Sequence, residues 1–327
     1  MTTPPDLAAD HNRIAIIGAG HVGATAAYAL MLRALVREIV LIDSNTALAQ
    51  AEAADIADAN ALARPARVWA GDYADAASAA IAVITAGGAT QGSQDRLSVA
   101  TQSAAIVSAC VDQLMAASFK GIIVVAANPV DLMTLVALRR SELSASRVIG
   151  TGTLLDTSRL TQTLSRSLKV APASIEGFVL GEHGNSEVAA FSTVRIGGQT
   201  LDHFCQGQDQ LHLPAIAHEV RDAGYAIVEG KGYTSFGVAT AIVRICEAIL
   251  RDEHAVLPVS TFLTGEYGLS DLCLSLPCVL GATGVERVLT PDLDPREVEG
   301  LAASAAVLKA ALASLAMDPD VLEPDRR

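Results

Sequence analysis

The 327-residue sequence has few charged residues, few aromatic residues and a shortage of positive charge. Charged residues make up 18% and aromatic residues 4%, and 23 Lys and Arg stand against 36 Asp and Glu, a formal net charge of −13. So acidic a chain opposes binding to nucleic-acid phosphates and to anionic membranes, because both need clustered positive charge. We therefore expect neither nucleic acid nor membrane as a partner.

Long apolar runs and a regular cysteine pattern are missing as well. No uninterrupted apolar run reaches the ~18 residues that a membrane-spanning helix needs. Residues 1–12 have no basic segment followed by an apolar one, which predicts a flexible arm and not a secretory signal. The five cysteines are odd in number and fit no zinc-binding spacing, so we expect reduced, buried thiols in a cytoplasmic protein.

Apolar residues are plentiful, at 51% of the chain, and this excludes intrinsic disorder. In the first half, short Ile/Val/Ala runs alternate with stretches long enough for helices, a pattern typical of a parallel sheet covered on both faces. We predict an α/β protein: a Rossmann-type doubly wound domain over residues 13–150 and an α+β substrate domain over residues 151–327. The expected strands of the first domain are 13–17, 38–42, 68–70, 81–85, 122–126 and 148–150.

A glycine-rich turn follows the first expected strand, since residues 18–23 are Gly-Ala-Gly-His-Val-Gly. Between a strand and a helix, Gly18 allows the tight turn, Gly20 allows a pyrophosphate to approach, and Gly23 allows close helix–strand packing. Asp43 ends the next strand and would accept hydrogen bonds from a ribose while repelling a 2′-phosphate, which favours NAD over NADP. The alternative is a glycine turn that binds nothing.

Four further segments carry polar residues that apolar packing does not require. They are Asp-Arg-Leu at 95–97, Ala-Asn-Pro-Val at 127–130, Leu-Asp-Thr-Ser-Arg at 155–159 and Gly-Glu-His-Gly-Asn-Ser at 181–186. Each alone fits an ordinary loop. Together, in this order after the glycine-rich turn, they resemble the lactate/malate dehydrogenase family, and the Gly-Glu-His-Gly form resembles its lactate branch. Segments at 231–235, 265–268 and 277–280 extend the resemblance over nearly the whole chain.

The resemblance implies an NAD-dependent enzyme that interconverts an L-2-hydroxy acid and its 2-oxo acid, with no metal. His183 would be the base, oriented by Asp156. Arg159 would bind the substrate carboxylate, and Arg96 would polarise the C2 oxygen from a mobile loop. Further substrate contacts are implied for Asn128, Thr90, Gln91, Gly224 and Thr234, and cofactor contacts for Gly18, Gly20, His21, Val22, Gly23, Asp43, Thr85, Ala86, Gly87, Asn128 and Val238.

Two positions depart from the family pattern in ways that bear on the substrate. Six residues before the loop arginine, malate enzymes have Arg and lactate enzymes Gln, whereas this chain has Thr90 with Gln91 beside it. An uncharged residue there disfavours dicarboxylates, because a buried unpaired carboxylate is costly. Gly224 replaces a usual Ala, so we expect room for larger apolar or aromatic side chains. Neutral drift at Gly224 and an ordinary L-lactate dehydrogenase remain the alternatives.

Three other departures concern charge and regulation. Asn185 stands where the family usually has Asp. Thr161 and Glu176 occupy the positions that bind fructose 1,6-bisphosphate in activated relatives, so we expect no such activation. The resemblance favours a homotetramer, with a homodimer as the alternative. An NAD-dependent glycosidase and a binding protein without catalysis are rival interpretations, disfavoured by the absence of Cys/His metal ligands and by the complete catalytic set, respectively.

Overall fold

The computed structural model describes residues 13–63, 66–88, 96–206 and 211–315, without the side chains of residues 96–98. The predicted N-terminal arm and the pair Thr90 and Gln91 lie outside these residues. The first half forms six parallel strands in the order β6-β5-β4-β1-β2-β3. They are β1 (Arg13–Ile17), β2 (Glu38–Ile42), β3 (Arg67–Ala70), β4 (Ile81–Ile84), β5 (Ile122–Val125) and β6 (Val148–Gly150). The order reverses between β1 and β4, where ligands bind in such sheets.

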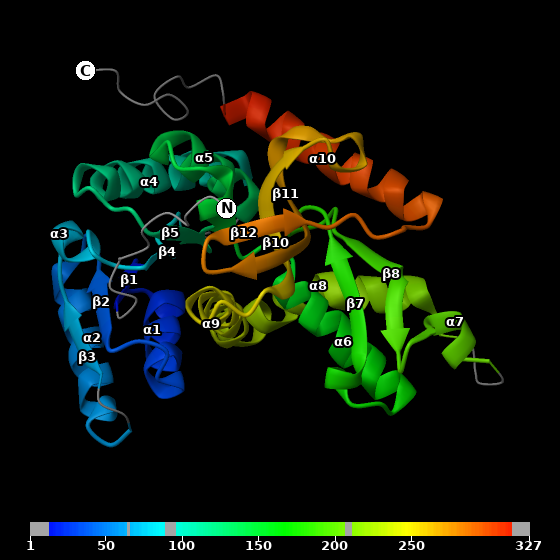
Figure 1. Cartoon of the computed structure of the whole chain (residues 1–327), viewed down its shortest axis with the longest axis horizontal. Coiled ribbons are helices and arrows are strands. Elements are labelled where there is room, and N and C mark those ends of the chain that lie inside the picture. The colour runs from blue at the N-terminus through cyan, green and yellow to red at the C-terminus, as the bar shows by residue number, and fades with distance from the viewer. Residues whose placement is uncertain (1–12, 64–65, 89–95, 207–210, 316–327) are drawn as a thin grey trace, which may run out of the picture.

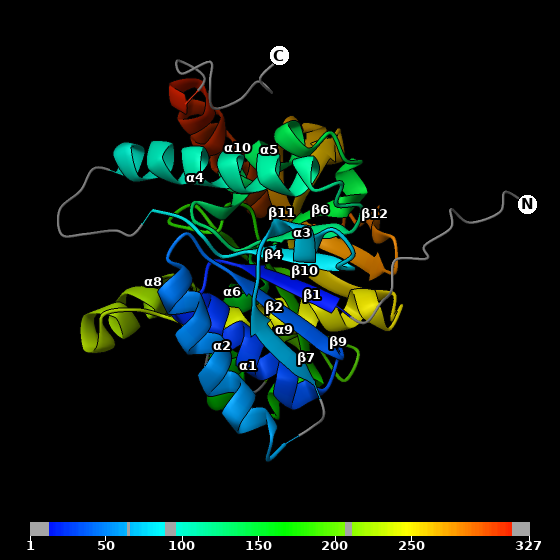
Figure 2. The same cartoon turned by 90° about the vertical axis from the view of Figure 1, so that its left-hand side faces the viewer.

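Helices cover both faces of this sheet, as Figures 1 and 2 show. One face carries α1 (His21–Arg33), α2 (Thr46–Asn60) and α9 (Phe236–Leu250), and the other α4 (Arg96–Ala116), α5 (Val130–Ser141) and α10 (Pro295–Leu315), with the short α3 (Tyr73–Ala76) beside α4. Strand β1 packs against the helices on both faces, because Ile14 and Ile16 point to the first face and Ala15 and Ile17 to the second. This confirms the predicted Rossmann-type α/β fold.

The second half of the chain contributes to two sheets. Strands β10 (Ala255–Thr264), β11 (Ser270–Gly281) and β12 (Gly284–Val288) extend the first sheet to nine strands, with β10 antiparallel to β6 at Ser260 and Gly150. Strands β7 (Ile175–Leu180), β8 (Val188–Ile196) and β9 (Gln199–Thr200) form a three-stranded sheet that packs against α6 (Leu154–Leu168), α7 (Leu201–Phe204) and α8 (Leu213–Lys231). The boundary at residue 150 stays a prediction, and strands β10, β11 and β12 beyond it belong to the sheet of the first half.

Helix α5 and strand β12 were absent from the sequence-based expectations. Ten of the twelve residues of α5 are buried, so its sequence has no polar face and lacks the 3.6-residue period of a surface helix. Strand β12 reads Gly-Val-Glu-Arg-Val and exposes both charged residues at a sheet edge, which hid it among loop residues. Of the six strands predicted for the first half, β1, β2 and β6 have the expected bounds, and β3, β4 and β5 each differ by one residue at one end.

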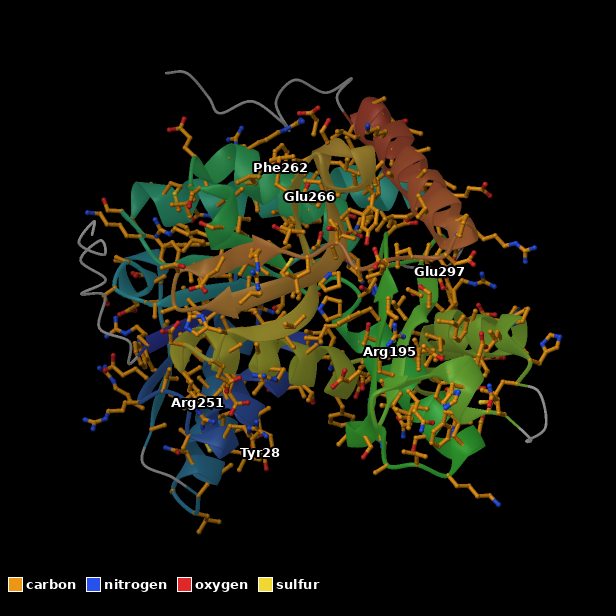
Figure 3. All side chains as sticks on the ribbon, turned by 45° about the vertical axis from the view of Figure 1, so that its right-hand side comes forward. Tyr28, Arg195, Arg251, Phe262, Glu266 and Glu297 are labelled. Atoms are coloured by element: carbon orange, nitrogen blue, oxygen red, sulfur yellow. The ribbon has the colours of Figure 1, made fainter. Side chains whose placement is uncertain are left out.

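Helix α10 is long and apolar enough, by length and composition alone, to cross a membrane, which the sequence analysis did not expect. It packs on the protein: Leu301 and Leu308 lie in the main core. Near its start the Glu297 carboxylate accepts a hydrogen bond from the Ser192 N–H at 3.0 Å, and Figure 3 shows Glu297 beside the strand that carries Arg195. All five cysteines are free, as expected for reduced thiols. Four of them are buried as predicted, whereas Cys205 is partly exposed.

Candidate active site

The glycine-rich turn joins β1 to α1 at the switch point of the sheet. Gly18 has φ +104°, a conformation that L side chains rarely adopt. A methyl on Gly23 would lie 1.8 Å from the Gly18 carbonyl oxygen, whereas a methyl on Gly20 would meet nothing within 4 Å. A side chain would thus strain the turn at Gly18 and the packing at Gly23, whereas Gly20 leaves space in front of the turn. The first N–H groups of α1 have no partner within the helix and are available to an anion.

Asp43 follows β2 and reaches back to the turn. One carboxylate oxygen accepts from the Ala19 N–H at 2.7 Å and the other from the Asn45 N–H at 2.8 Å. Thr85, at the end of β4, donates its hydroxyl to the Gly18 carbonyl oxygen at 2.8 Å. Each carboxylate oxygen can accept a further bond, so Asp43 can hold the turn and still bind a ribose hydroxyl.

The catalytic histidine and its aspartate meet as expected. Asp156 lies in the first turn of α6 and His183 in the loop after β7. A hydrogen bond from the Val179 N–H to the Thr157 hydroxyl joins the two elements. The His183 Nδ1 lies 2.6 Å from Asp156 Oδ2, and Arg159 donates from Nη1 to Asp156 Oδ1 at 2.8 Å. Asp156 is 1% exposed and His183 is 27% exposed, so the carboxylate is shielded while the imidazole stays accessible.

The charges of this group set its protonation. Burial lowers the pKa of His183, but attraction and hydrogen bonding to Asp156, aided by Asp131 and Glu187, outweigh it and raise the pKa to about 9. Burial alone would raise the pKa of Asp156, but His183 and Arg159 hold it below its usual range. The pair is therefore a carboxylate bound to an imidazolium at neutral pH, ready to donate a proton.

Arg159 also lies near residues that were predicted to contact substrate or cofactor on α8, on α9 and between these helices. A methyl on Gly224 would lie 3.5 Å from Arg159 Nη2, so this glycine borders the guanidinium. Arg159, Thr234 and Val238 also line one groove of about 870 Å³, although His183 does not line it. The Arg159 guanidinium has five N–H donors, and one holds Asp156, so the others remain for a substrate carboxylate.

The remaining predicted residues are placed less fully. Asn128 is exposed at the carboxyl end of β5, and Ala86 and Gly87 follow β4 at the same edge of the sheet. Arg96 begins α4, but its side chain lies outside the described part of the structure. The predicted residues that follow β1, β2, β4 and β5 thus lie at the carboxyl ends of the parallel strands.

Comparisons with known proteins agree with this geometry. Residues 12–150 match the family model of the lactate/malate dehydrogenase NAD binding domain, and residues 153–317 that of the lactate/malate dehydrogenase alpha/beta C-terminal domain. The chain belongs to the lactate/malate dehydrogenase family. The L-lactate dehydrogenase of Moorella thermoacetica is 41% identical over 310 residues, which cover 93% of this chain and 98% of the relative.

Two further relatives belong to the lactate branch by name. The L-lactate dehydrogenase of Thermus aquaticus is 40% identical over 307 residues, covering 93% of this chain and 99% of the relative. A crystal structure of the minor L-lactate dehydrogenase from Enterococcus mundtii in the ligands-bound form matches with a TM-score of 0.90 at 38% identity, covering 93% of this chain and 98% of that chain. The dehydrogenase described here is thus an NAD-dependent oxidoreductase of the lactate-like type.

The cofactor fits the described residues. The open space at Gly20, the free N–H groups of α1 and the carboxylate of Asp43 suit the pyrophosphate and ribose of NAD. His21, the first residue of α1, stacks on Tyr233 with ring centroids 3.9 Å apart and planes 12° apart. This stack joins the cofactor turn of the dehydrogenase to the residue before Thr234, a contact that sequence reasoning missed because the two rings are far apart in the chain.

Two acids near His183 in the dehydrogenase were also missed. Asp131 is fully buried on α5 and accepts the His183 main-chain N–H at 2.8 Å. Its burial raises the pKa of its carboxyl to about 6, against the hydrogen bonds that it accepts. A carboxylate oxygen of Glu187 lies within 4.8 Å of a His183 ring nitrogen and of an Asp156 carboxylate oxygen. Such a cluster was not expected from the sequence, and the Arg159 cation bonded to Asp156 makes it unsuited to a metal ion.

The departures from the family pattern have visible partners. Asn185 accepts a hydrogen bond from the Tyr225 hydroxyl at 2.9 Å, so the active-site loop is tied to α8 next to Gly224. Thr161 donates its hydroxyl to the Ser158 carbonyl oxygen at 3.0 Å, and Glu176 is exposed on β7. Neither of the latter two side chains supplies positive charge.

Proposed function

We propose that the enzyme interconverts an L-2-hydroxy acid and its 2-oxo acid, accepts larger apolar or aromatic side chains and rejects dicarboxylates. The observation that carries the first part is the pairing of His183 with Asp156 at 2.6 Å, beside the guanidinium of Arg159. A hydroxy acid needs one group that takes its hydroxyl proton and one that holds its carboxylate, and these residues supply both.

The reaction follows from the charges of these groups. Bound NAD would supply the acceptor for the hydride that leaves C2, and the hydroxyl oxygen of the substrate would become a carbonyl oxygen. His183 takes the hydroxyl proton at Nε2, because Nδ1 already bonds Asp156. Asp156 keeps the ring oriented and stabilises the imidazolium. In the reverse direction His183 returns that proton, and Arg96 would stabilise the developing negative charge on the oxygen.

The proposal for larger side chains rests on Gly224. A methyl at this position would touch Arg159 at 3.5 Å, so its absence enlarges the space next to the group that would hold the substrate carboxylate. The change is small, since one methyl group amounts to about 1 kcal/mol of discrimination in an apolar pocket. The lactate dehydrogenase names of the relatives support the alternative, pyruvate as the preferred substrate.

A kinetic panel separates these two possibilities. With NADH, we expect kcat/KM for 2-oxoisocaproate and phenylpyruvate to match or exceed that for pyruvate. Gly224→Ala should shift the ratio toward pyruvate by about fivefold, in keeping with one methyl group. A strong preference of the native enzyme for pyruvate would reject the larger side chain and leave ordinary L-lactate dehydrogenase.

The rejection of dicarboxylates rests on Thr90, which has no charge to pair with a second carboxylate. Oxaloacetate should therefore be a poor substrate, because an unpaired buried carboxylate costs several kcal/mol. Thr90→Arg should raise kcat/KM for oxaloacetate by at least tenfold. An unchanged value would mean that residue 90 does not face the substrate.

We further propose a homotetramer, or alternatively a homodimer, located in the cytoplasm and not activated by fructose 1,6-bisphosphate. Large apolar side chains lie exposed on α1, α8 and α9, which supports assembly. Figure 3 shows one of them, Tyr28, on the outside of α1. The free thiols support the location. Thr161 and Glu176 offer no positive charge to a bisphosphate, so the effector should leave the kinetics unchanged.

A further inference from the structure

Glu187 has no function in the mechanism above, although it lies at its centre. It ends the loop that carries His183 and begins the chain into β8. One of its carboxylate oxygens comes within 4.8 Å of both a His183 ring nitrogen and an Asp156 carboxylate oxygen. Two acids, Asp156 and Glu187, therefore share one small region with a single histidine.

The surroundings of Glu187 do not satisfy a negative charge. Its Oε1 atom is buried and, among the described residues, has no hydrogen-bond partner. The two nearby cations form ion pairs with other acids: Arg159 binds Asp156 at 2.8 Å, and Arg221 lies 3.4 Å from Asp222. An unpaired charged oxygen in a buried place is costly, whereas a neutral carboxyl group tolerates the same place far better.

We propose that Glu187 is a positioning residue that holds a proton beside the His183–Asp156 pair, and so limits the negative charge against which the substrate carboxylate must bind. The inference rests on the proposed function, because it assigns an electrostatic role within that substrate site. Burial and the neighbouring Asp156, against weaker attraction from His183, Arg159 and Arg221, raise the pKa of Glu187 to about 8, in agreement with the geometry.

Ionisation of Glu187 has two opposite effects on the site. The new charge repels the substrate carboxylate, which weakens binding. It also stabilises the imidazolium of His183, whose other facing acids are Asp156 on α6 and Asp131 on α5. In the native enzyme, KM for a 2-oxo acid should thus rise before kcat falls as the pH increases.

The test is the pH dependence of KM and kcat for 2-oxo-acid reduction between pH 6.5 and 9.5 in native enzyme and Glu187→Gln. Native KM should rise about three- to tenfold between pH 7 and 8.5, as expected for charges a few ångströms apart at a partly exposed site. In Glu187→Gln, KM should stay flat over this range and the fall in kcat should move to lower pH. An equal rise of KM in both proteins would overturn the proposal.

Matched variants separate charge from structure. Glu187→Asp keeps a titrating carboxyl and should retain the rise in KM. Glu182→Gln removes a carboxylate from the same loop, one that accepts a hydrogen bond from Ser186, and should show the native pH dependence. A merely structural role of Glu187 would instead change the melting temperature and lower kcat equally at every pH in both Glu187 variants.

A measurement independent of turnover distinguishes this proposal from the proposed function. In protein labelled with ¹³C at the glutamate carboxyl carbons, one NMR resonance should titrate near pH 8 and be missing in Glu187→Gln. If that resonance is found but no 2-oxo acid is reduced, the proposed function fails and the proton on Glu187 stands. If 2-oxo acids are reduced but every glutamate titrates in the ordinary range, the assignment of Glu187 fails alone.

Discussion

At the scale of single residues, the charge on His183 depends on Asp156. Replacing Asp156 by Asn leaves the ring without an anion and Arg159 without its partner. We expect kcat to fall by about 10³- to 10⁴-fold, as in other enzymes whose catalytic histidine loses its aspartate. Steady-state kinetics with NADH and a 2-oxo acid measure the effect.

Glu286 on β12 provides a matched control. Glu286 also bonds a histidine nitrogen, His254 Nδ1 at 2.8 Å, but at an exposed site. Glu286→Gln should leave kcat within about twofold of the native value, as exposed substitutions usually do. A loss of equal size in both variants would mean that Asp156 acts through general stability and not through His183.

The raised pKa of His183 also predicts opposite pH profiles for the two directions. The folded-state pKa of about 9 lies above the ordinary value, so the imidazolium persists at neutral pH and is lost as the pH rises through about 9. Reduction of a 2-oxo acid needs that proton and should decline through this range, whereas oxidation of a hydroxy acid needs the neutral ring and should increase. Parallel profiles in both directions would contradict the role of His183 as acid and base.

Sequence reasoning identified three side chains that lie together in the structure, and their chemical roles stay predictions. His183, Asp156 and Arg159 come from motifs of fixed order, and the structure brings them together. Asp131 and Glu187 were not predicted, because an acid inside an apolar helix or before a strand has no sequence spacing that identifies it as part of a site. Their importance comes from burial and from contacts across the fold, and neither is visible in one dimension.

At the scale of elements, the stack of His21 on Tyr233 links the start of α1 to the segment between α8 and α9. Lys231 lies over the Tyr233 ring at 4.3 Å, so a cation supports the same contact. An aromatic pair is worth about 0.5–1.5 kcal/mol beyond the area that it buries. His21→Ala should therefore weaken NADH binding by about two- to tenfold, because the stack holds the phosphate-binding turn.

A double-mutant cycle tests this link. NADH dissociation constants of the native protein, His21→Ala, Tyr233→Ala and the double variant can be measured by fluorescence titration. The double variant should be no weaker than the worse single variant, since the two rings make one interaction. Fully additive losses would show that the rings act independently of each other.

The same scale explains which elements the sequence could predict. Strands β1, β2 and β4 are buried on both faces, so their sequences are apolar runs. The segments between these runs are long enough for helices, which made the helices predictable as well. Helix α5 is buried all round and β12 is charged, so each lacks the pattern of its type. The extension of the first sheet by β10–β12 depends on the open edge of β6, a long-range pairing that local sequence does not specify.

At the scale of the whole molecule, a net charge of −13 repels anionic ligands in general, so binding of a carboxylate depends on a few local cations. Arg159 is the described cation that we propose for the substrate carboxylate, and Asp156 already accepts one of its hydrogen bonds. Additional negative charge near it would work against the substrate. A protonated Glu187 and an uncharged Asn185 in place of the family's Asp would favour the binding of any carboxylate. An uncharged Thr90 would disfavour dicarboxylates, because it gives a second carboxylate no partner.

The exposed apolar side chains predict assembly of the whole molecule. Phe236 is 71% exposed and Leu32 is 47% exposed, and both line the groove between α1, α6, α8 and α9. Contiguous apolar surface of this kind marks a protein–protein interface.

Phe236→Glu should lower the molar mass measured by light scattering after size-exclusion chromatography, and should make the melting temperature fall on dilution. Leu62→Glu, at a position that is 94% exposed outside the groove, should keep the native mass. A native monomer at micromolar concentration, or an unchanged mass of Phe236→Glu, would contradict assembly through this face.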